Sequence, residues 1–281
     1  MKKIFSLATL FAFVLVAAVA CSADNYTAEI PTEIYVEIPP QVVKPPPTPT
    51  PETPPPPKET HPPDDAPPPE DTPPPKVALT FDDGPSMHTA AILDVLEQYD
   101  ARATFFVLGN RIPSYRATVK RAVELGSEIA NHTHSHPRLT TQTDSQIIRE
   151  IQYTSAAIKA IAGTSPQIYR PPFGATDERV IKISKELGYG IVKWTLDPLD
   201  WRDRDPNTIY DRIMSQVEDG SVIVLHDIHK TTAQAMKRVI PSLIEKGFKL
   251  VTVSELLEHR YGGLEAGNIH GSYCAWRIWD N

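Results

Sequence analysis

From Lys76 onward the chain alternates short apolar runs with amphipathic segments, and this repeat limits the folds that it can adopt. Most apolar runs are β-branched or aromatic, as buried parallel strands are. About seven β/α units predict an α/β fold, a small and distorted parallel (β/α) barrel rather than an open doubly wound sheet. The predicted strands are 77–81, 103–108, 128–131, 167–169, 190–194, 222–225 and 249–253, and the predicted helices are 88–99, 114–125, 144–162, 177–187, 207–218 and 232–246.

Residues 1–21 have the composition of an export signal. Lys2 and Lys3 precede a largely apolar run that ends in small residues, as secretory signals do. Cys21 follows at once, so the segment resembles the bacterial lipoprotein pattern, in which this thiol receives lipid. The alternative is ordinary cleavage after Ala20, which would leave Cys21 incidental. We expect the lipidated form, because cysteine is otherwise scarce in the chain.

The rest of the chain divides into three parts. Residues 22–75 are predicted to be a disordered linker, since 19 of the 37 residues in 39–75 are proline and favour extended polyproline II. Residues 76–260 hold the β/α repeat, and 261–281 form a tail rich in glycine and aromatic residues. Its Cys274 is the only other cysteine, and we expect no structural disulfide.

Charge and motifs exclude two functional classes. The formal net charge of −7 argues against a nucleic-acid partner, because such proteins usually carry a basic footprint. The chain also lacks a glycine-rich phosphate loop, which argues against a nucleotide enzyme.

Polar clusters follow the predicted strands at their carboxyl ends. In a β/α barrel this is the face on which active sites lie, and a random scatter of polar residues would not produce the pattern. The clusters are 82–83, 132–136, 170–174, 197–201 and 225–227.

Two of these clusters suggest a metal site. His132 and His136 are four residues apart, which places both imidazoles on one side of a helical turn. With Asp83 at a neighbouring strand end, they form an Asp/His/His ligand set suited to zinc. The adjacent Asp82 then has a carboxylate free to act as a base toward water. The alternative is an acidic turn and a chance histidine pair.

The other clusters offer groups that could complete a hydrolytic site. Arg170 could pair with a surface acid, but here it is expected to hold a catalytic carboxylate. Pro172 and the proline before it give a rigid backbone that can present an amide. Asp197 could cap a turn, and Trp201 could be core. His226 in isolation would be a core histidine, but facing the other clusters it becomes a general-acid candidate.

Together the five clusters resemble the five ordered motifs of the polysaccharide deacetylases, the NodB-homology group or carbohydrate esterase family 4. The resemblance covers about 76–258. It implies a distorted (β/α) barrel that binds a divalent metal, most commonly zinc, with Co²⁺ or others possible. It also implies that Asp83, His132 and His136 are the metal ligands, that Asp82 is the general base, and that Arg170 orients Asp82.

The same resemblance assigns the remaining roles. His226 would be the general acid, and Asp197 would set its charge. Trp201 and Leu225 would wall the acetyl pocket. A backbone amide near Phe173, where the family often has tyrosine, would help to hold the oxyanion.

These assignments predict an enzyme that acts on an acetylated polysaccharide. An export signal, an anchor cysteine and a long linker favour peptidoglycan, with the chain exported and held at the membrane by its lipid, or else secreted. Chitin oligomers, poly-N-acetylglucosamine and O-acetylated xylan are alternatives, and a non-catalytic glycan-binding domain is a further one. We expect a monomer.

Overall fold

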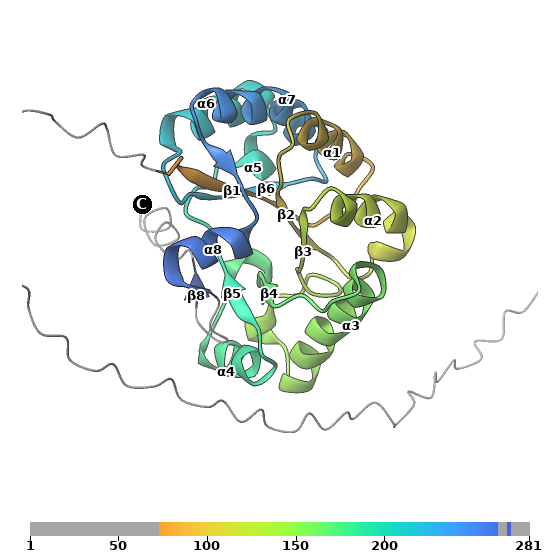
Figure 1. The fold of residues 1–281 in the computed structure, drawn as a ribbon. Helices are drawn as coiled ribbons and strands as arrows, with labels where there is room; N and C mark the ends of the chain where they lie inside the picture. Colours follow the sequence, from red (N-terminus) through yellow and green to blue (C-terminus); the bar gives the residue numbers. More distant parts are fainter. Residues whose placement is uncertain (1–72, 264–268, 271–281) are drawn as a thin grey trace, which may run out of the picture. The chain divides into compact units, whose positions relative to one another are not determined.

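The computed structural model describes residues 73–263 and the backbone of 269–270 (Figure 1). The predictions for the export signal, Cys21, most of the linker and most of the tail, Cys274 included, lie outside the described residues. In the part that is described, no helix is long and apolar enough to cross a membrane.

Every strand of the sheet runs parallel to its neighbours. The order is β6-β1-β2-β3-β4-β5-β8, and β7 pairs with the amino end of β1. All seven predicted strands are confirmed, most of them shortened, and β8 is an addition. The strands are β1 (Lys76–Asp82), β2 (Thr104–Val107), β3 (Glu128–Asn131), β4 (Ile168–Tyr169), β5 (Gly190–Val192), β6 (Val222–His226), β7 (Lys249–Leu250) and β8 (Ile269–His270).

The sheet curls into a half-barrel, which confirms the predicted fold. Strands β5 and β6 do not pair in a regular ladder. The segment after β5 joins β6 through one parallel bridge, Leu196 to Ile223, and through backbone hydrogen bonds between Thr195 or Leu196 and Val222 or Val224. The distortion of the barrel therefore includes irregular pairing on this side.

Helices surround the curved sheet (Figure 1). The six predicted helices are present, and α3 has the predicted bounds, because a Thr143–Gln146 capping box starts it and left-handed Gly163 ends it. Helices α5 and α8 were not predicted. The helices are α1 (Thr89–Gln98), α2 (Arg116–Glu124), α3 (Asp144–Ala162), α4 (Glu178–Glu186), α5 (Asp200–Asp203), α6 (Pro206–Gln216), α7 (Lys230–Glu245) and α8 (Val253–Tyr261).

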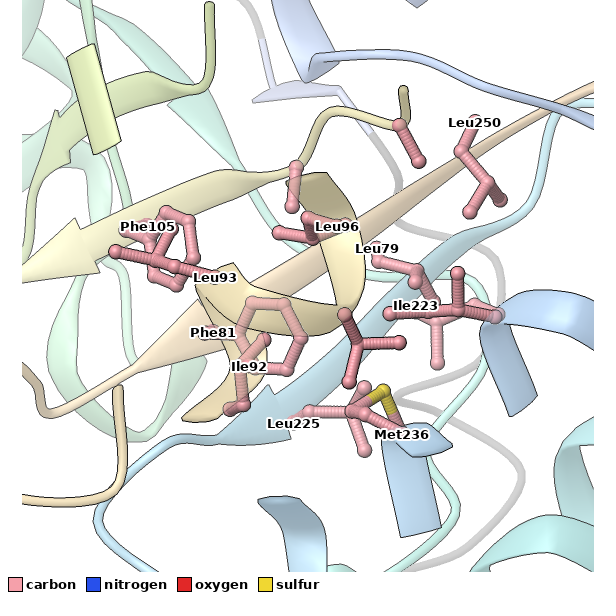
Figure 2. Packing of buried hydrophobic residues seen from close by; sticks show 14 of the residues in the cluster. Leu79, Phe81, Ile92, Leu93, Leu96, Phe105, Ile223, Leu225, Met236 and Leu250 are labelled. Carbon is pink, nitrogen blue, oxygen red and sulfur yellow. The ribbon is translucent and has the colours of Figure 1, made fainter. Parts of the chain in front are cut away.

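The largest core lies between the sheet and its outer helices. Figure 2 shows Phe81 and Leu225, from neighbouring strands, packed with Ile92 of α1 and Met236 of α7. All four side chains are fully buried, and each stabilises the fold by about 1.5–3 kcal/mol. This core supports β1 and β6, the two strands that end in Asp82 and His226.

Candidate active site

Asp82 and Arg170 form a buried ion pair at the carboxyl edge of the sheet. Arg170 Nη1 donates to Asp82 Oδ1 at 2.7 Å and to Thr80 Oγ1 at 2.8 Å. Its remaining nitrogens donate to the carbonyl oxygens of Val192 and Lys193. Because the guanidinium is fully buried and bonded on all sides, it holds one oxygen of Asp82 in place. The predicted contact between Arg170 and Asp82 is thus present.

Asp83 reaches the same site through a backbone turn. Alternation along a strand would direct Asp82 and Asp83 to opposite faces of the sheet. Asp83 has instead a φ of 69°, so the chain leaves the strand in the left-handed region. Its Oδ1 then lies 3.4 Å from His132 Nε2 and 3.3 Å from His136 Nε2.

These three side chains fit a metal ion. Their ligand atoms lie within 4.8 Å of one another. Asp83 Oδ1 is buried and accepts no hydrogen bond from the described residues, as expected of an oxygen reserved for a cation. Burial alone would raise the pKa of Asp83, but His132, His226 and His136 lower it below the usual carboxylate value. A negative carboxylate beside two imidazoles is a ligand set that zinc accepts.

The hydrogen bond at the other ring nitrogen of His132 fixes its tautomer. Nδ1 lies 2.7 Å from the carbonyl oxygen of Arg170. A carbonyl only accepts, so Nδ1 carries the proton and Nε2 keeps a lone pair for a metal. The residue that holds Asp82 through its side chain therefore also orients a metal ligand through its backbone.

The two histidines lie in a loop, not in the helical turn that their spacing predicted. Thr133 and His136 have φ values of 70° and 61°, and a positive φ is rare for a β-branched residue such as Thr133. These two bends bring the imidazole rings of His132 and His136 to a centroid distance of 5.0 Å. The pairing was predicted correctly, but for the wrong structural reason.

Helix α3 restrains this loop through two side chains. Asn131 accepts from the Thr133 amide and donates to Ile151 and Ser155 of α3. Glu150 of α3 accepts three hydrogen bonds of 2.7–2.8 Å, which come from the His134 amide and from the amide and hydroxyl of Ser135.

Replacing Glu150 is expected to weaken metal binding, because the loop between the two histidine ligands would lose its anchor. Glu150→Ala should raise the zinc dissociation constant by about 10–100-fold, and Glu150→Gln by less, since its one amide oxygen can still accept. Competition with a chelating dye measures this. Gln152→Ala, at an exposed position of the same helix, is the matched control. Equal affinities in all four proteins would rule out this anchoring role.

The carboxylate that contacts His226 is Asp200, which corrects the assignment of Asp197. Asp200 Oδ1 lies 2.8 Å from His226 Nδ1, and Oδ2 accepts from the His226 amide and from Thr232 Oγ1. Asp197 instead accepts from the Leu199 amide and, at 3.5 Å, from Trp201 Nε1. A left-handed Leu199 turns the chain so that fully buried Asp200 faces the histidine.

His226 is thereby held in its charged form. Burial by itself lowers the pKa of His226, but Asp200, with smaller effects of Asp82 and Asp83, raises it to about 9. His226 lies directly opposite Asp82 in the register of β6 and β1, so an acid and a base meet at one point of the sheet edge.

The residues predicted to line the substrate pocket divide into two groups. Phe173 and Trp201 are 59% and 44% exposed, so they form the rim, and buried Pro172 supports Phe173. Leu225 does not line the pocket, because it lies in the outer core of Figure 2. Side chains alternate along β6, so Val224 and not Leu225 shares the face of His226.

One further buried carboxyl group was not predicted. Asp227 accepts from Thr89 Oγ1, and its backbone carbonyl accepts from Ser86 Oγ. Burial raises the pKa of Asp227 to about 7. A side chain at Gly84 would overlap its carboxylate, so glycine is required where the loop after Asp83 crosses it. The only feature of the sequence that pointed to Asp227 was its position directly after His226.

Comparison with known proteins agrees with this geometry. The model of the family described as "Polysaccharide deacetylase" matches residues 69–192. The peptidoglycan-N-acetylmuramic acid deacetylase PdaC of Bacillus subtilis is 42% identical over 65% of this chain and 38% of its own length. A peptidoglycan-N-acetylglucosamine deacetylase of Bacillus cereus is 34% identical over 66% of this chain and 89% of its own.

A solved structure shows the same fold. The peptidoglycan deacetylase PdaC from Bacillus subtilis superposes with a TM-score of 0.63 at 41% identity, covering 66% of this chain and 91% of that one. The chain therefore belongs to the polysaccharide deacetylase family. It spans well under half of the full B. subtilis relative, 38% of its length.

Proposed function

We propose that this protein hydrolyses N-acetyl groups of a cell-wall polysaccharide, most specifically of N-acetylglucosamine in peptidoglycan. One observation carries the proposal. A base candidate held by Arg170, a metal-ligand set and a charged histidine converge on one edge of the sheet. The names of the relatives support peptidoglycan as the substrate.

Each group has a chemical task in this reaction. A divalent metal held by Asp83, His132 and His136, with zinc the foremost candidate, would polarise the acetyl carbonyl and activate water. Asp82 accepts a proton from the attacking water, while the hydrogen bond from Arg170 orients its carboxylate. A backbone amide near Phe173 is proposed to stabilise the charge that develops on the carbonyl oxygen.

His226 completes the cycle. An amide nitrogen does not leave as an anion, so the carbon–nitrogen bond breaks only as His226 donates its proton to that nitrogen. The products are acetate and a free amino sugar. The Asp200 carboxylate stabilises the imidazolium before the transfer.

We also propose that the protein acts outside the cell membrane. The support is the signal-like segment 1–21, with Cys21 as the lipid attachment site. At about 3.1 Å per residue, a polyproline II linker over 39–75 could extend roughly 115 Å and carry the catalytic domain into the wall. Labelling with a radioactive fatty acid tests this, and a Cys21→Ala variant that still takes up the label would refute it.

Acetate release tests the proposed activity. The full chain, stripped of metal by a chelator, is offered peptidoglycan, chitopentaose and acetylxylan, each with and without zinc. We expect release from peptidoglycan that depends on zinc and is absent from His132→Ala, which lacks a ligand. Release only from chitopentaose or acetylxylan would change the substrate. No release from any of the three, with zinc bound, would favour a glycan-binding domain.

A further inference from the structure

Two exposed arginines at the rim of the site have no carboxylate partner among the described residues. Neither Arg138 nor Arg204 lies within ion-pair distance of an acidic group in the described part of the chain. In contrast, Arg202 and Arg212, close to Arg204 in sequence, both pair with Asp203. Two uncompensated cations beside an active site suggest that a ligand supplies the negative charge.

Arg138 lies on the metal-ligand side of the site. Its guanidinium carbon is 4.9 Å from the centre of the Phe173 ring, and that ring is 4.7 Å from the ring of His136. Thr141 donates through its amide and hydroxyl to the Arg138 carbonyl, so the backbone is held by a turn. The backbone of Arg138 is therefore held in place, and the Phe173 ring lies between its guanidinium and the metal ligand His136.

Arg204 lies on the general-acid side. Its backbone is left-handed, with a φ of 50°, and its Nε donates to the carbonyl of Trp201 at 3.3 Å. Trp201 lies at the rim of the site, and the charge of Arg204 adds to burial in lowering the pKa of His229. The His229 ring is in turn 6.1 Å from the ring of His226.

We propose that Arg138 and Arg204 bind carboxylates carried by the sugars on either side of the reacting residue. The inference rests on the proposed function and makes it more specific. In peptidoglycan, N-acetylglucosamine is flanked on both sides by sugars bearing a lactyl group, which is either a free acid or linked to an acidic peptide. Chitin has no such acid. Arginine suits this task, since its planar fork binds a carboxylate through two hydrogen bonds.

Preference for an acidic glycan depends on local charges near the site. Over residues 73–263, lysines plus arginines and aspartates plus glutamates number 23 each, so the net charge of this domain neither attracts nor repels a polyanionic glycan. At physiological salt, screening limits the reach of a surface charge to about 8 Å. A carboxylate bound at the rim therefore interacts mainly with the cations at the rim. The two arginines would therefore supply the positive charge where the substrate lies.

The test compares selectivity, defined as kcat/KM for an acidic glycan divided by kcat/KM for chitopentaose. We expect Arg138→Gln and Arg204→Gln each to lower selectivity about fivefold, as the loss of one partly exposed charged hydrogen bond predicts. The double variant should lower selectivity by about 25-fold. Added salt should lower selectivity in the wild type and much less in the double variant. Lys159→Gln, which removes one exposed charge at the far end of α3, is the control.

Two acidic substrates separate the sources of the carboxylate. Glycan strands freed of peptide carry only lactyl acids, and intact strands carry peptide acids. If the variants lose selectivity for both glycans, the arginines bind the lactyl carboxylate or the peptide acid attached at the same position. If they lose selectivity for intact strands alone, the arginines bind the peptide acids. Selectivity within twofold of the wild type for every variant and both glycans would overturn the inference.

Calorimetry keeps this test separate from the proposed activity. The same glycans and chitopentaose are titrated into Asp82→Asn and into that variant with both arginines replaced. Weaker binding of the acidic glycan alone would support the inference even without turnover, and equal weakening for both ligands would reject it. Wild-type protein that binds but releases no acetate would count against the proposed function only.

Discussion

Asp82→Asn is expected to lower kcat for acetate release by about 10²–10⁴-fold, the usual contribution of a general base. The amide has nearly the shape of the carboxylate but cannot take a proton from water. Its oxygen can still accept from Arg170 Nη1, so the local geometry should persist. Metal binding should also persist, because Asp83, His132 and His136 are unchanged.

Three measurements make this result interpretable. Steady-state acetate release gives kcat, metal analysis gives zinc per chain, and thermal unfolding gives Tm. Some loss of Tm is expected, because fully buried Arg170 loses its counter-charge, and a broken buried pair is costly. Turnover close to the wild type in a zinc-loaded variant would exclude Asp82 as the base.

The second large effect is expected from Asp200→Asn. The variant removes the negative charge beside His226 Nδ1 and should reduce kcat by about 10³-fold or more, as for the carboxylate partner of a catalytic histidine in serine proteases. Asp197→Asn is the matched control three residues away. Among the described residues its carboxylate accepts hydrogen bonds from Leu199 and Trp201 and none from His226, so we expect a loss of about tenfold or less.

The pH profile distinguishes the two carboxylates further. His226 must be protonated to donate, and its pKa is raised to about 9, so wild-type activity should fall as the pH rises through about 9. Without Asp200, burial dominates and the pKa drops, so the alkaline limb of the profile should move to lower pH. A larger shift in Asp197→Asn than in Asp200→Asn would restore the assignment made from sequence.

The fold could be predicted from the sequence because its signals are local. Apolar runs of strand length, amphipathic periods and caps such as Thr143 and Gly163 act within a few residues of themselves. The strand order and the irregular pairing beside Leu196 depend on contacts between distant segments, and neither was predicted. Helix α8 was missed as well, although the Thr252–Glu255 capping box that starts it is a local signal.

The active site also divides into features that local sequence predicts and features that depend on tertiary contacts. Asp82, Asp83, His132, His136, Arg170 and His226 were recognisable in sequence, because each follows or ends a predicted strand. The choice of Asp200 over Asp197 was made only in three dimensions. Alternation along the predicted strand already favours Val224 over Leu225, and the sequence analysis did not apply it. The sequence by itself determined which chemical groups stand at the strand ends. The tertiary structure decided which of two nearby carboxylates reaches an imidazole, because one left-handed residue, Leu199, redirects the chain.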